Sequence, residues 1–205
     1  TNVVDPVTAV ITSISYDHMA VLGNTLEQIA AEKGGIIKAE RPVVVAPQND
    51  AVTVVLKNIA LERHAPFFQT GVDFHYEMRD HSLDGQSFYA WNSEQQSDGK
   101  MTYSIPLLGR HQVENAVTAL AALHVANRNG LPVSDQAIQK GFSDVLWPGR
   151  FEIINREPLV IVDSAHNRDS ARRLRETLDD YFPDTPVLLV FGASEDKDVK
   201  GMFDE

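Results

Sequence analysis

The stretch that decides the fold is DHMAVLGNTLEQIAAEKGG, at residues 17–35. The run before it, VTAVITSI at residues 7–14, is rich in β-branched side chains and long enough to predict a buried strand. Asn24 or Thr25 would cap a following helix, which the pair Gly34–Gly35 ends. A strand, a turn and a helix in this order predict the start of an α/β sheet, whose ligands bind at the carboxyl ends of the strands.

Two side chains in this stretch have chemistry that a site could use. His18 follows soon after the predicted strand, and Lys33 lies in the last turn of the predicted helix. Each alone is ordinary, as a loop histidine and as a cation that interacts favourably with a helix C-terminus. Because adjacent elements present them near the edge of the sheet where ligands bind, both are candidates for one site.

The composition excludes several classes of function. The chain has 205 residues, 43% of them hydrophobic, which is enough for one large domain or two smaller ones. The net charge of −11 argues against a nucleic-acid partner, since such proteins need a basic face. No apolar run reaches the roughly 18 residues of a membrane span. The absence of cysteine excludes disulfides and thiolate metal sites, and we expect a reducing compartment, the cytoplasm.

Strands and helices continue to alternate beyond the opening stretch. Residues 42–48 predict a second buried strand, and residues 51–63 carry a helical stripe of apolar side chains. This alternation is typical of a parallel sheet with helices on its faces. In residues 64–106 the pattern changes to short runs separated by Gly, Asp and Ser, namely APFFQ, DFHYEM, SFYAWN and MTYSIP. These runs predict β-hairpins in an antiparallel patch that carries no site.

The second half of the chain predicts helices and then a new domain. Helices are expected at about residues 113–129 and 134–142, and Pro148–Gly149 indicates a turn and a joint between domains. Beyond the joint, a strand, a helix and a strand predict the start of a Rossmann-like domain, at residues 159–163, 169–181 and 187–192. We therefore expect two domains, residues 1–148 and 149–205.

The opening stretch resembles the central domain of folylpolyglutamate synthase/dihydrofolate synthase, which belongs with the Mur ligases among the ATP-dependent amide ligases. Asp-His, Leu-Gly-x-Thr-Leu-Glu-x-Ile-Ala, Glu-Lys and Gly-Ile-Ile-Lys carry the resemblance, in this order. It implies that His18 and Lys33 are catalytic, that His18 is a magnesium ligand, and that Lys33 is carbamylated to support metal and phosphate. Gly34 stands where this motif has alanine, and we expect the difference to be neutral.

A second motif of the family is similar to G-R-H-Q-x-x-N-A-x-x-A-L, which begins at Gly109. The resemblance implies that Asn115 contacts the adenine of ATP. In the predicted helix Asn115 lies off the apolar stripe, so it is free to face a ligand. Arg110 and His111 are either further candidates or exposed loop residues.

Three motifs near the joint resemble the same family. W-P-G-R-F-E implies that Arg150 contacts the ATP phosphates when the domains close, although Arg150 could instead be a surface arginine paired with Glu152. D-x-A-H-N implies that Asp163 contacts the ribose and that His166 lies beside the nucleotide. The segment GASEDKD makes Lys197 a candidate for contact with substrate or phosphate, or else part of a solvated charge run.

The resemblance implies an ATP-dependent ligase that adds L-glutamate to dihydropteroate, to folylpolyglutamate or to both, through an acyl phosphate and with Mg²⁺. Its partners would be ATP, L-glutamate and a pteroate or folate, with no membrane involved; the oligomeric state stays open. No phosphate loop of the form G-x-x-x-x-G-K-[ST] occurs in residues 1–205. In the family this loop lies upstream, so we expect these residues alone to be inactive.

Three alternatives remain open. A Mur-type peptidoglycan ligase would share the histidine, lysine, asparagine and arginine roles, although the long match in the opening stretch and D-x-A-H-N favour the folate branch. A non-catalytic nucleotide-binding module would keep the fold without turnover. A structural α/β domain would require the ordered motif matches to be accidental.

Overall fold

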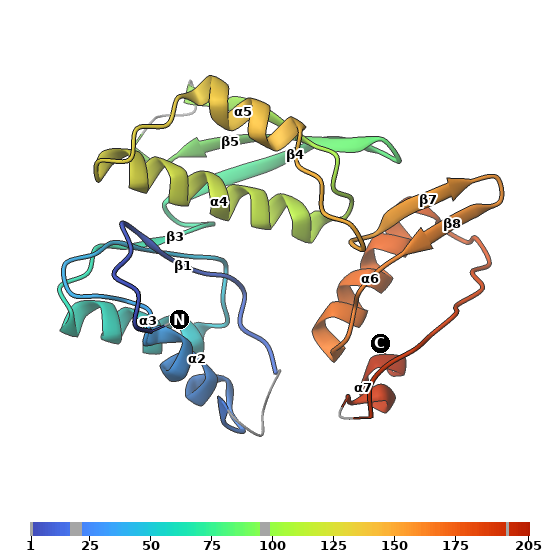
Figure 1. The fold of residues 1–205 in the computed structure, drawn as a ribbon, viewed down its shortest axis with the longest axis horizontal. Coiled ribbons are helices and arrows are strands. Elements are labelled where there is room, and N and C mark those ends of the chain that lie inside the picture. The colour runs from blue at the N-terminus through green and yellow to red at the C-terminus, as the bar shows by residue number, and fades with distance from the viewer. Residues whose placement is uncertain (1, 17–21, 95–98, 196) are drawn as a thin grey trace.

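The computed structural model describes residues 2–16, 22–94, 99–195 and 197–205. Within these residues three sheets form, with helices packed against them (Figure 1). The elements, in chain order, are β1 (Ala9–Ile11), α2 (Leu26–Gly34), β2 (Val43–Val45), α3 (Asp50–Glu62), β3 (Phe67–Gln69), β4 (Phe74–Ser82), β5 (Gly85–Asn92), β6 (Met101–Ile105), α4 (Arg110–Arg128), α5 (Asp135–Ser143), β7 (Glu152–Arg156), β8 (Leu159–Val162), α6 (Arg168–Tyr181) and α7 (Val199–Phe203). No helix of this described part is long and apolar enough to cross a membrane.

The first sheet is parallel, with strand order β1-β2-β3, which confirms the α/β prediction for the opening stretch. Its central strand β2 is fully buried because both faces are covered. Val43 and Val45 pack into the core beneath α2 and α3, whereas Val44 packs on the other side with α4. In Figure 1, α4 accordingly lies between this sheet and the antiparallel one.

One strand of this sheet was predicted wrongly. The run that contains residues 67–69 was expected to form a hairpin, yet it pairs with β2 in parallel register. The reason is the crossover through α3, which returns the chain to the starting end of the sheet and makes a parallel neighbour the natural outcome. The local pattern of a short apolar run does not distinguish the two pairings.

The predicted first strand is shorter and less buried than expected. The expected range was residues 7–14, and the strand covers Ala9–Ile11 at the sheet edge, where Val10 is 38% exposed. Past its end the Gln48 side chain continues the pairing, since its Oε1 accepts from Ile14 N at 2.9 Å and its Nε2 donates to Thr12 O at 2.8 Å. The segment that leaves the sheet edge is therefore held in place by a side chain.

Helix α2 begins and ends as its sequence predicts. Thr25 is the N-cap, and it forms a reciprocal capping box with Gln28, whose backbone N–H donates to Thr25 Oγ1 at 3.2 Å. The helix ends at Gly34, and Gly35 follows in a right-handed conformation. Nη1 of Arg63 donates to the carbonyl oxygens of Gly34 and Gly35, at 3.4 and 3.3 Å. This cation satisfies the open carbonyl groups at the helix C-terminus, close to Lys33.

We expect Gly34→Ala to change the free energy of unfolding by less than about 1 kcal/mol. Alanine favours the helix by about 1 kcal/mol over glycine. Its Cβ would lie 2.6 Å from Cδ1 of Ile59, a side-chain tip that can turn away at similar cost. Urea denaturation measures the difference, and Gly34→Val should lose about 1–3 kcal/mol as an overpacked control. A loss above about 2 kcal/mol for alanine would show that Ile59 cannot move.

The remaining part of the predicted first domain is an antiparallel sheet, β4-β5-β6, covered by α4 and α5. The predicted antiparallel patch is thus confirmed for these three strands. Helix α4 starts at Arg110 instead of residue 113, because Gly109 with φ +100° makes the turn just before it. The buried Gln86 side chain supports that turn, donating to Leu107 O at 2.6 Å and to Gly109 O at 2.8 Å.

Beyond the predicted joint, β8 and α6 form as expected, but two features differ. Residues 152–156 form β7, an unpredicted strand that pairs with β8 as an antiparallel hairpin. Residues 187–192, predicted as a strand, form none, and Leu188 and Val190 are 92% and 90% exposed. A strand needs a hydrogen-bonded neighbour, and the described residues offer this segment none. The predicted β-α-β unit is therefore wrong in its last strand.

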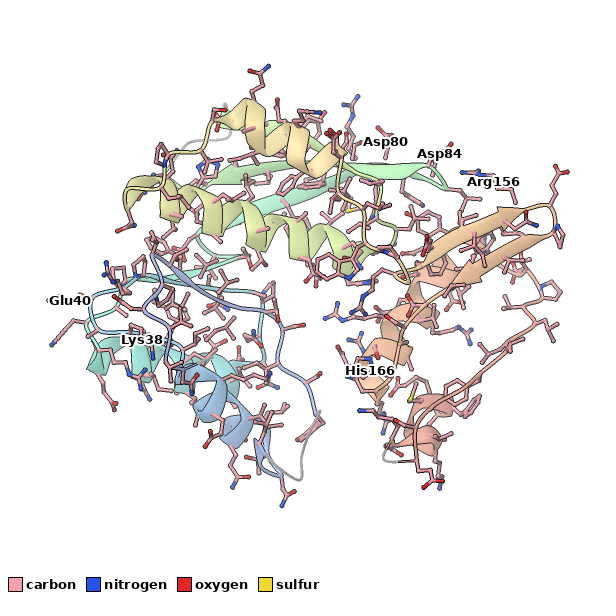
Figure 2. The ribbon with its side chains drawn as sticks, in the orientation of Figure 1. Lys38, Glu40, Asp80, Asp84, Arg156 and His166 are labelled. Atoms are coloured by element: carbon pink, nitrogen blue, oxygen red, sulfur yellow. The ribbon has the colours of Figure 1, made fainter. Side chains whose placement is uncertain are left out.

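Charged side chains of the two predicted domains contact each other. Arg156 on β7 donates to Asp84 Oδ1 at 2.5 Å, and both residues are labelled in Figure 2. Arg110, at the start of α4, makes two bonds to Asp180 of α6, at 2.8 and 2.9 Å. Both pairs join segments far apart in the sequence, so α6 is placed beside the first turn of α4.

Candidate active site

A cavity of about 650 Å³ lies where α2, α4, the joint and α6 approach one another. Ligand pockets commonly have volumes of about 300–1,000 Å³. Predicted site residues from four separate segments line it, namely Lys33, Asn115, Arg150, Asp163 and His166. Apolar side chains form part of its wall, including Leu107, Phe142 and Leu174. The structure therefore brings together residues that are up to 133 positions apart, from Lys33 to His166.

Two predicted site residues are not placed in this cavity. His18, the predicted magnesium ligand, lies outside the described residues. Lys197 precedes α7, where its backbone N–H donates to Ser194 O at 3.1 Å, and it is not one of the cavity-lining residues of the described chain. Its contact with substrate or phosphate stays a prediction.

Lys33 and Arg150 are the cations of the cavity with unused side-chain groups. Among the described residues, neither has a partner for a side-chain hydrogen bond or ion pair. Lys33 is exposed at the end of α2. The alternative that Arg150 pairs with Glu152 is wrong, because Glu152 Oε2 instead accepts from Gly149 N at 2.7 Å. Both cations are thus free to meet an anionic ligand.

The backbone on either side of Arg150 is held in an uncommon conformation. Gly149 has φ +74°, and Phe151 has φ +43°, where a bulky residue is strained by about 1–3 kcal/mol. Two contacts stabilise Phe151: its N–H donates to Asp163 Oδ2 at 2.8 Å, and its buried ring packs against Tyr181. Asp163 also accepts from Ala165 N through Oδ1, at 2.7 Å. Asp163 therefore supports the segment that presents Arg150.

We expect Asp163→Asn to lower the free energy of unfolding by about 1–3 kcal/mol. The amide has nearly the same shape, but its NH₂ group must face one of the two backbone N–H donors, at Phe151 or Ala165. Equilibrium unfolding in urea measures the loss. Asp179→Asn is the matched control, since Asp179 pairs with Arg175 on the exposed side of α6. Equal stability of the two variants would show that Asp163 does not hold the joint.

His166 lies at the N-terminal end of α6 and is labelled in Figure 2. Its Nδ1 is 3.0 Å from the carbonyl oxygen of Ser164, and its backbone N–H donates to Ser170 Oγ at 3.0 Å. The next residue, Asn167, caps α6 in a capping box with Ser170. The D-x-A-H-N turn thus has a structural function as well as a place at the cavity.

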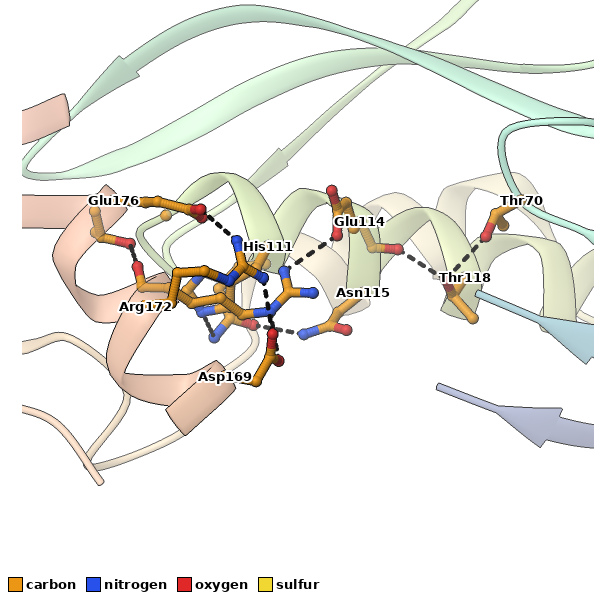
Figure 3. Close-up of polar contacts among 12 residues, drawn as sticks. Thr70, His111, Glu114, Asn115, Thr118, Asp169, Arg172 and Glu176 are labelled. Atoms are coloured by element: carbon orange, nitrogen blue, oxygen red, sulfur yellow. Dashed lines mark hydrogen bonds and ion pairs between the residues drawn. The ribbon is translucent and has the colours of Figure 1, made fainter. Parts of the chain in front are cut away.

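Asn115 lies off the apolar stripe of α4, as predicted, and is exposed toward the cavity. Its Nδ2 donates to Gln112 Oε1 at 3.3 Å, and Gln112 Nε2 is 3.1 Å from His111 Nε2 (Figure 3). Sequence reasoning missed Gln112, although its position three residues before Asn115 on a helix was a signal that the two side chains meet. Arg110, a weaker candidate, is occupied by its pair with Asp180.

Arg173 also lines the cavity and was not predicted. It pairs with Asp169 at 3.1 Å and with Glu114 of α4 at 3.3 Å. Both carboxylates are labelled in Figure 3. Burial raises the pKa of Asp169, but the hydrogen bonds and charges of Arg172 and Arg173 hold this pKa below its usual value. Arg173 therefore joins α6 to α4, and its charge is already balanced by two carboxylates.

The described residues suit a nucleotide better than they suit a metal. An exposed amide, an unpaired guanidinium, a carboxylate and apolar walls are the groups that a base, phosphates and a ribose would need. For Mg²⁺, which takes oxygen ligands, no group of three or more His, Asp or Glu side chains gathers anywhere in the described part of the chain. These residues do not form a magnesium site without others.

Comparisons with known proteins identify the family of this chain. The Mur ligase middle domain matches residues 1–123, and the family described as Mur ligase, glutamate ligase domain matches residues 149–205. Dihydrofolate synthase/folylpolyglutamate synthase of Bacillus subtilis (strain 168) is 36% identical over 203 residues, which cover 98% of this chain and 46% of that protein.

Two solved structures are similar throughout the chain. A complex of FPGS with AMPPCP and folate superposes with a TM-score of 0.91 at 30% identity, covering 99% of this chain and 49% of that one. Escherichia coli FolC in complex with DHPP and ADP gives a TM-score of 0.84 at 34% identity, covering 99% and 45%.

The chain spans less than half the length of each of these relatives. Its mixed α/β fold and the predicted resemblance are both confirmed by these matches. The chain belongs to the Mur ligase family, and its homologues are the folylpolyglutamate and dihydrofolate synthases.

Proposed function

We propose that the protein carrying this chain is an ATP-dependent carboxylate–amine ligase that adds L-glutamate to dihydropteroate, to folylpolyglutamate or to both. The observation that carries this proposal is that five predicted residues from four segments line one cavity, namely Lys33, Asn115, Arg150, Asp163 and His166. The names of the relatives, and the nucleotide and folate ligands of the solved structures, support the substrate class.

The proposed reaction has two steps. A carboxylate oxygen of the pterin substrate attacks the γ-phosphorus of ATP, which gives an acyl phosphate and ADP. The amine of L-glutamate then attacks the acyl carbon, so that an amide forms, the C–O bond to phosphate breaks, and the amine loses a proton. Phosphoryl transfer depends mainly on positioning and on charge stabilisation. Those are the tasks that the cavity residues are suited to perform.

Each residue has a separate task in this proposal. Asn115 binds the adenine, and Arg150 neutralises charge on the phosphates from its rigid support at the joint. Asp163 accepts a hydrogen bond from a ribose hydroxyl, since each carboxylate oxygen keeps a lone pair after it accepts one backbone N–H. Mg²⁺, when bound, would supply further charge neutralisation at the phosphates, with His18 as a ligand and carbamylated Lys33 as its support.

We also propose the organisation and location of the protein. The two domains would comprise residues 1–148 and 149–205 of this chain, in agreement with the two separate family matches. The absence of cysteine supports a reducing compartment such as the cytoplasm. The charge of −11 supports small molecules over nucleic acid as partners.

The test is ATP-dependent incorporation of labelled L-glutamate by the complete protein, offered dihydropteroate, a reduced folate or a Mur-type cell-wall precursor. Incorporation into a pterin substrate is the expected result. Incorporation into the cell-wall precursor alone would assign the protein to the Mur branch with the same mechanism, and incorporation into none would leave a non-catalytic nucleotide-binding module. Residues 1–205 alone, which contain no phosphate loop, should show no turnover.

A further inference from the structure

The Gln112 side chain is buried, with 8% of it exposed. A buried side-chain amide needs hydrogen-bond partners. Both of its polar atoms are used within one short chain of contacts. Its Oε1 accepts from Asn115 Nδ2 at 3.3 Å, and its Nε2 lies 3.1 Å from His111 Nε2. Because a buried amide without hydrogen bonds is unfavourable, the three side chains orient one another.

The direction of this chain of contacts follows from the donors and acceptors. Because Gln112 receives a hydrogen bond from Asn115 at Oε1, it can only donate to His111 through Nε2. His111 must then accept at its own Nε2, which requires the neutral imidazole with its proton on Nδ1.

The imidazole of His111 is confined as well. A Cβ on Gly109 would lie 2.7 Å from its Cε1 and 2.9 Å from its Nδ1, so the glycine leaves the space that the ring occupies. Packing against Gly109 thus fixes the His111 end of this series of hydrogen bonds.

We propose that Gln112 is a positioning residue for base specificity, which holds the Asn115 amide so that its carbonyl oxygen and one N–H face the cavity. This inference rests on the proposed function, in which Asn115 contacts adenine. An amide in that orientation matches adenine, which offers an amino donor beside a ring-nitrogen acceptor. Guanine offers two adjacent acceptors on the corresponding edge, O6 and N7, and would place O6 against the amide oxygen.

We call the hydrogen-bonded series His111–Gln112–Asn115 the relay. Reversal of its hydrogen-bond direction would favour guanine over adenine. If Gln112 turned over, its Nε2 would face Asn115, which would then turn its own oxygen inward and present its NH₂ group to the base. That arrangement suits the two acceptors of guanine better than adenine. Gln112 also lines the cavity, but both of its polar atoms are used by His111 and Asn115, so it sets the preference for ATP over GTP through Asn115.

The charge state of His111 makes the relay sensitive to pH. The charged groups around His111 are Glu114 on its own helix, Arg173 and Glu176 on α6, and Asp163 after β8. Burial and then the charge of Arg173 lower the pKa of His111 from its ordinary 6.5, against the three carboxylates. The acceptor at Nε2 is therefore present at neutral pH and is lost only as the pH falls through this lowered value.

The experiment compares the dissociation constants of ATP and GTP, measured by calorimetry on the complete protein. We expect the wild type to prefer ATP, and Gln112→Leu to lower the GTP-to-ATP ratio of dissociation constants about tenfold at neutral pH. In Gln112→Glu one oxygen still accepts from Asn115 and the other accepts from a protonated His111, so the ratio should be kept. In the wild type the ratio should also fall in acid, and in Gln112→Glu it should not.

Gln69→Leu is the matched control, since Gln69 has similar burial, at 9% exposure, and lies on β3 outside the cavity. It should keep the wild-type ratio. A structural role of Gln112 would weaken ATP and GTP equally, and an unchanged ratio in Gln112→Leu would overturn the relay while the proposed function stands. A wild type without preference for ATP would overturn the relay and the adenine-binding role of Asn115, whereas the ligase function is tested separately by glutamate incorporation.

Discussion

Replacement of Arg150 by glutamine in the complete protein is expected to lower kcat/KM for ATP-dependent glutamate transfer by about 100–1,000-fold. Arg150 lines the cavity and has no ion-pair partner among the described residues, so its charge is available to phosphates. Glutamine keeps hydrogen-bonding ability but removes the charge that balances the developing negative charge. Initial rates at several ATP concentrations measure the effect.

The control for this variant is Arg175→Gln. Arg175 lies on α6, pairs with Asp179 at 2.9 Å and is 63% exposed outside the cavity, so its loss should change the rate less than about twofold. Equal and small effects of the two substitutions would contradict a phosphate-binding role for Arg150. A large effect of both would indicate that the charge of the domain as a whole matters, and the specific role would be wrong.

Substitution of Lys33 by alanine is expected to lower the rate of glutamate transfer about 100-fold or more. In the proposed function its carbamate supplies a carboxylate on a long arm at the cavity, and alanine removes both the arm and the charge. Because the group that is lost is a carboxylate, added acetate or propionate should restore part of the activity. The measurement is the rate of Lys33→Ala as a function of the concentration of added acid.

Two comparisons separate this role from a structural one. Lys57→Ala on α3, where the amine lies 5.7 Å from the Phe67 ring centroid, is exposed outside the cavity and should keep the wild-type rate. If Lys33 is not carbamylated, added carboxylic acids will not restore activity to Lys33→Ala. That result would contradict the proposed carbamate. Wild-type activity in Lys33→Ala would remove the residue from the site altogether.

The elements with strong local signals were predictable from the sequence. Thr25 and Gln28 cap α2, Ser134 caps α5 and Asn167 caps α6, and in each case the side chain and the backbone group that it bonds lie within three residues. The position of Asn115 off the apolar stripe also followed from helical periodicity alone. Local chemistry of this kind depends little on what the rest of the chain does.

The ordered motifs carried the family resemblance in the same way, since each motif is a continuous string. The cavity then united residues of four strings that the sequence could only place one by one. Their convergence was implied by the resemblance and became visible only in the folded chain.

Partner choice between distant segments was decided by tertiary structure. Residues 67–69 became a parallel strand because α3 returned the chain to β2, whereas residues 187–192, equally apolar, met no neighbour among the described residues and formed no strand. A short apolar run has the same local energy in either setting, and only the strand beside it decides which pairing forms.

The polar contacts that join α6, the joint and α4 depend on tertiary structure for the same reason. Asp163 holds the strained backbone at Phe151, and Arg173 joins Glu114 to Asp169, through contacts that span up to 59 positions of sequence. Local propensity sets which residues form helices and which side chains cap them. The bonds from Phe151 to Asp163 and from Arg173 to Glu114 are set by packing, because each exists only when two separate segments lie together and exclude water.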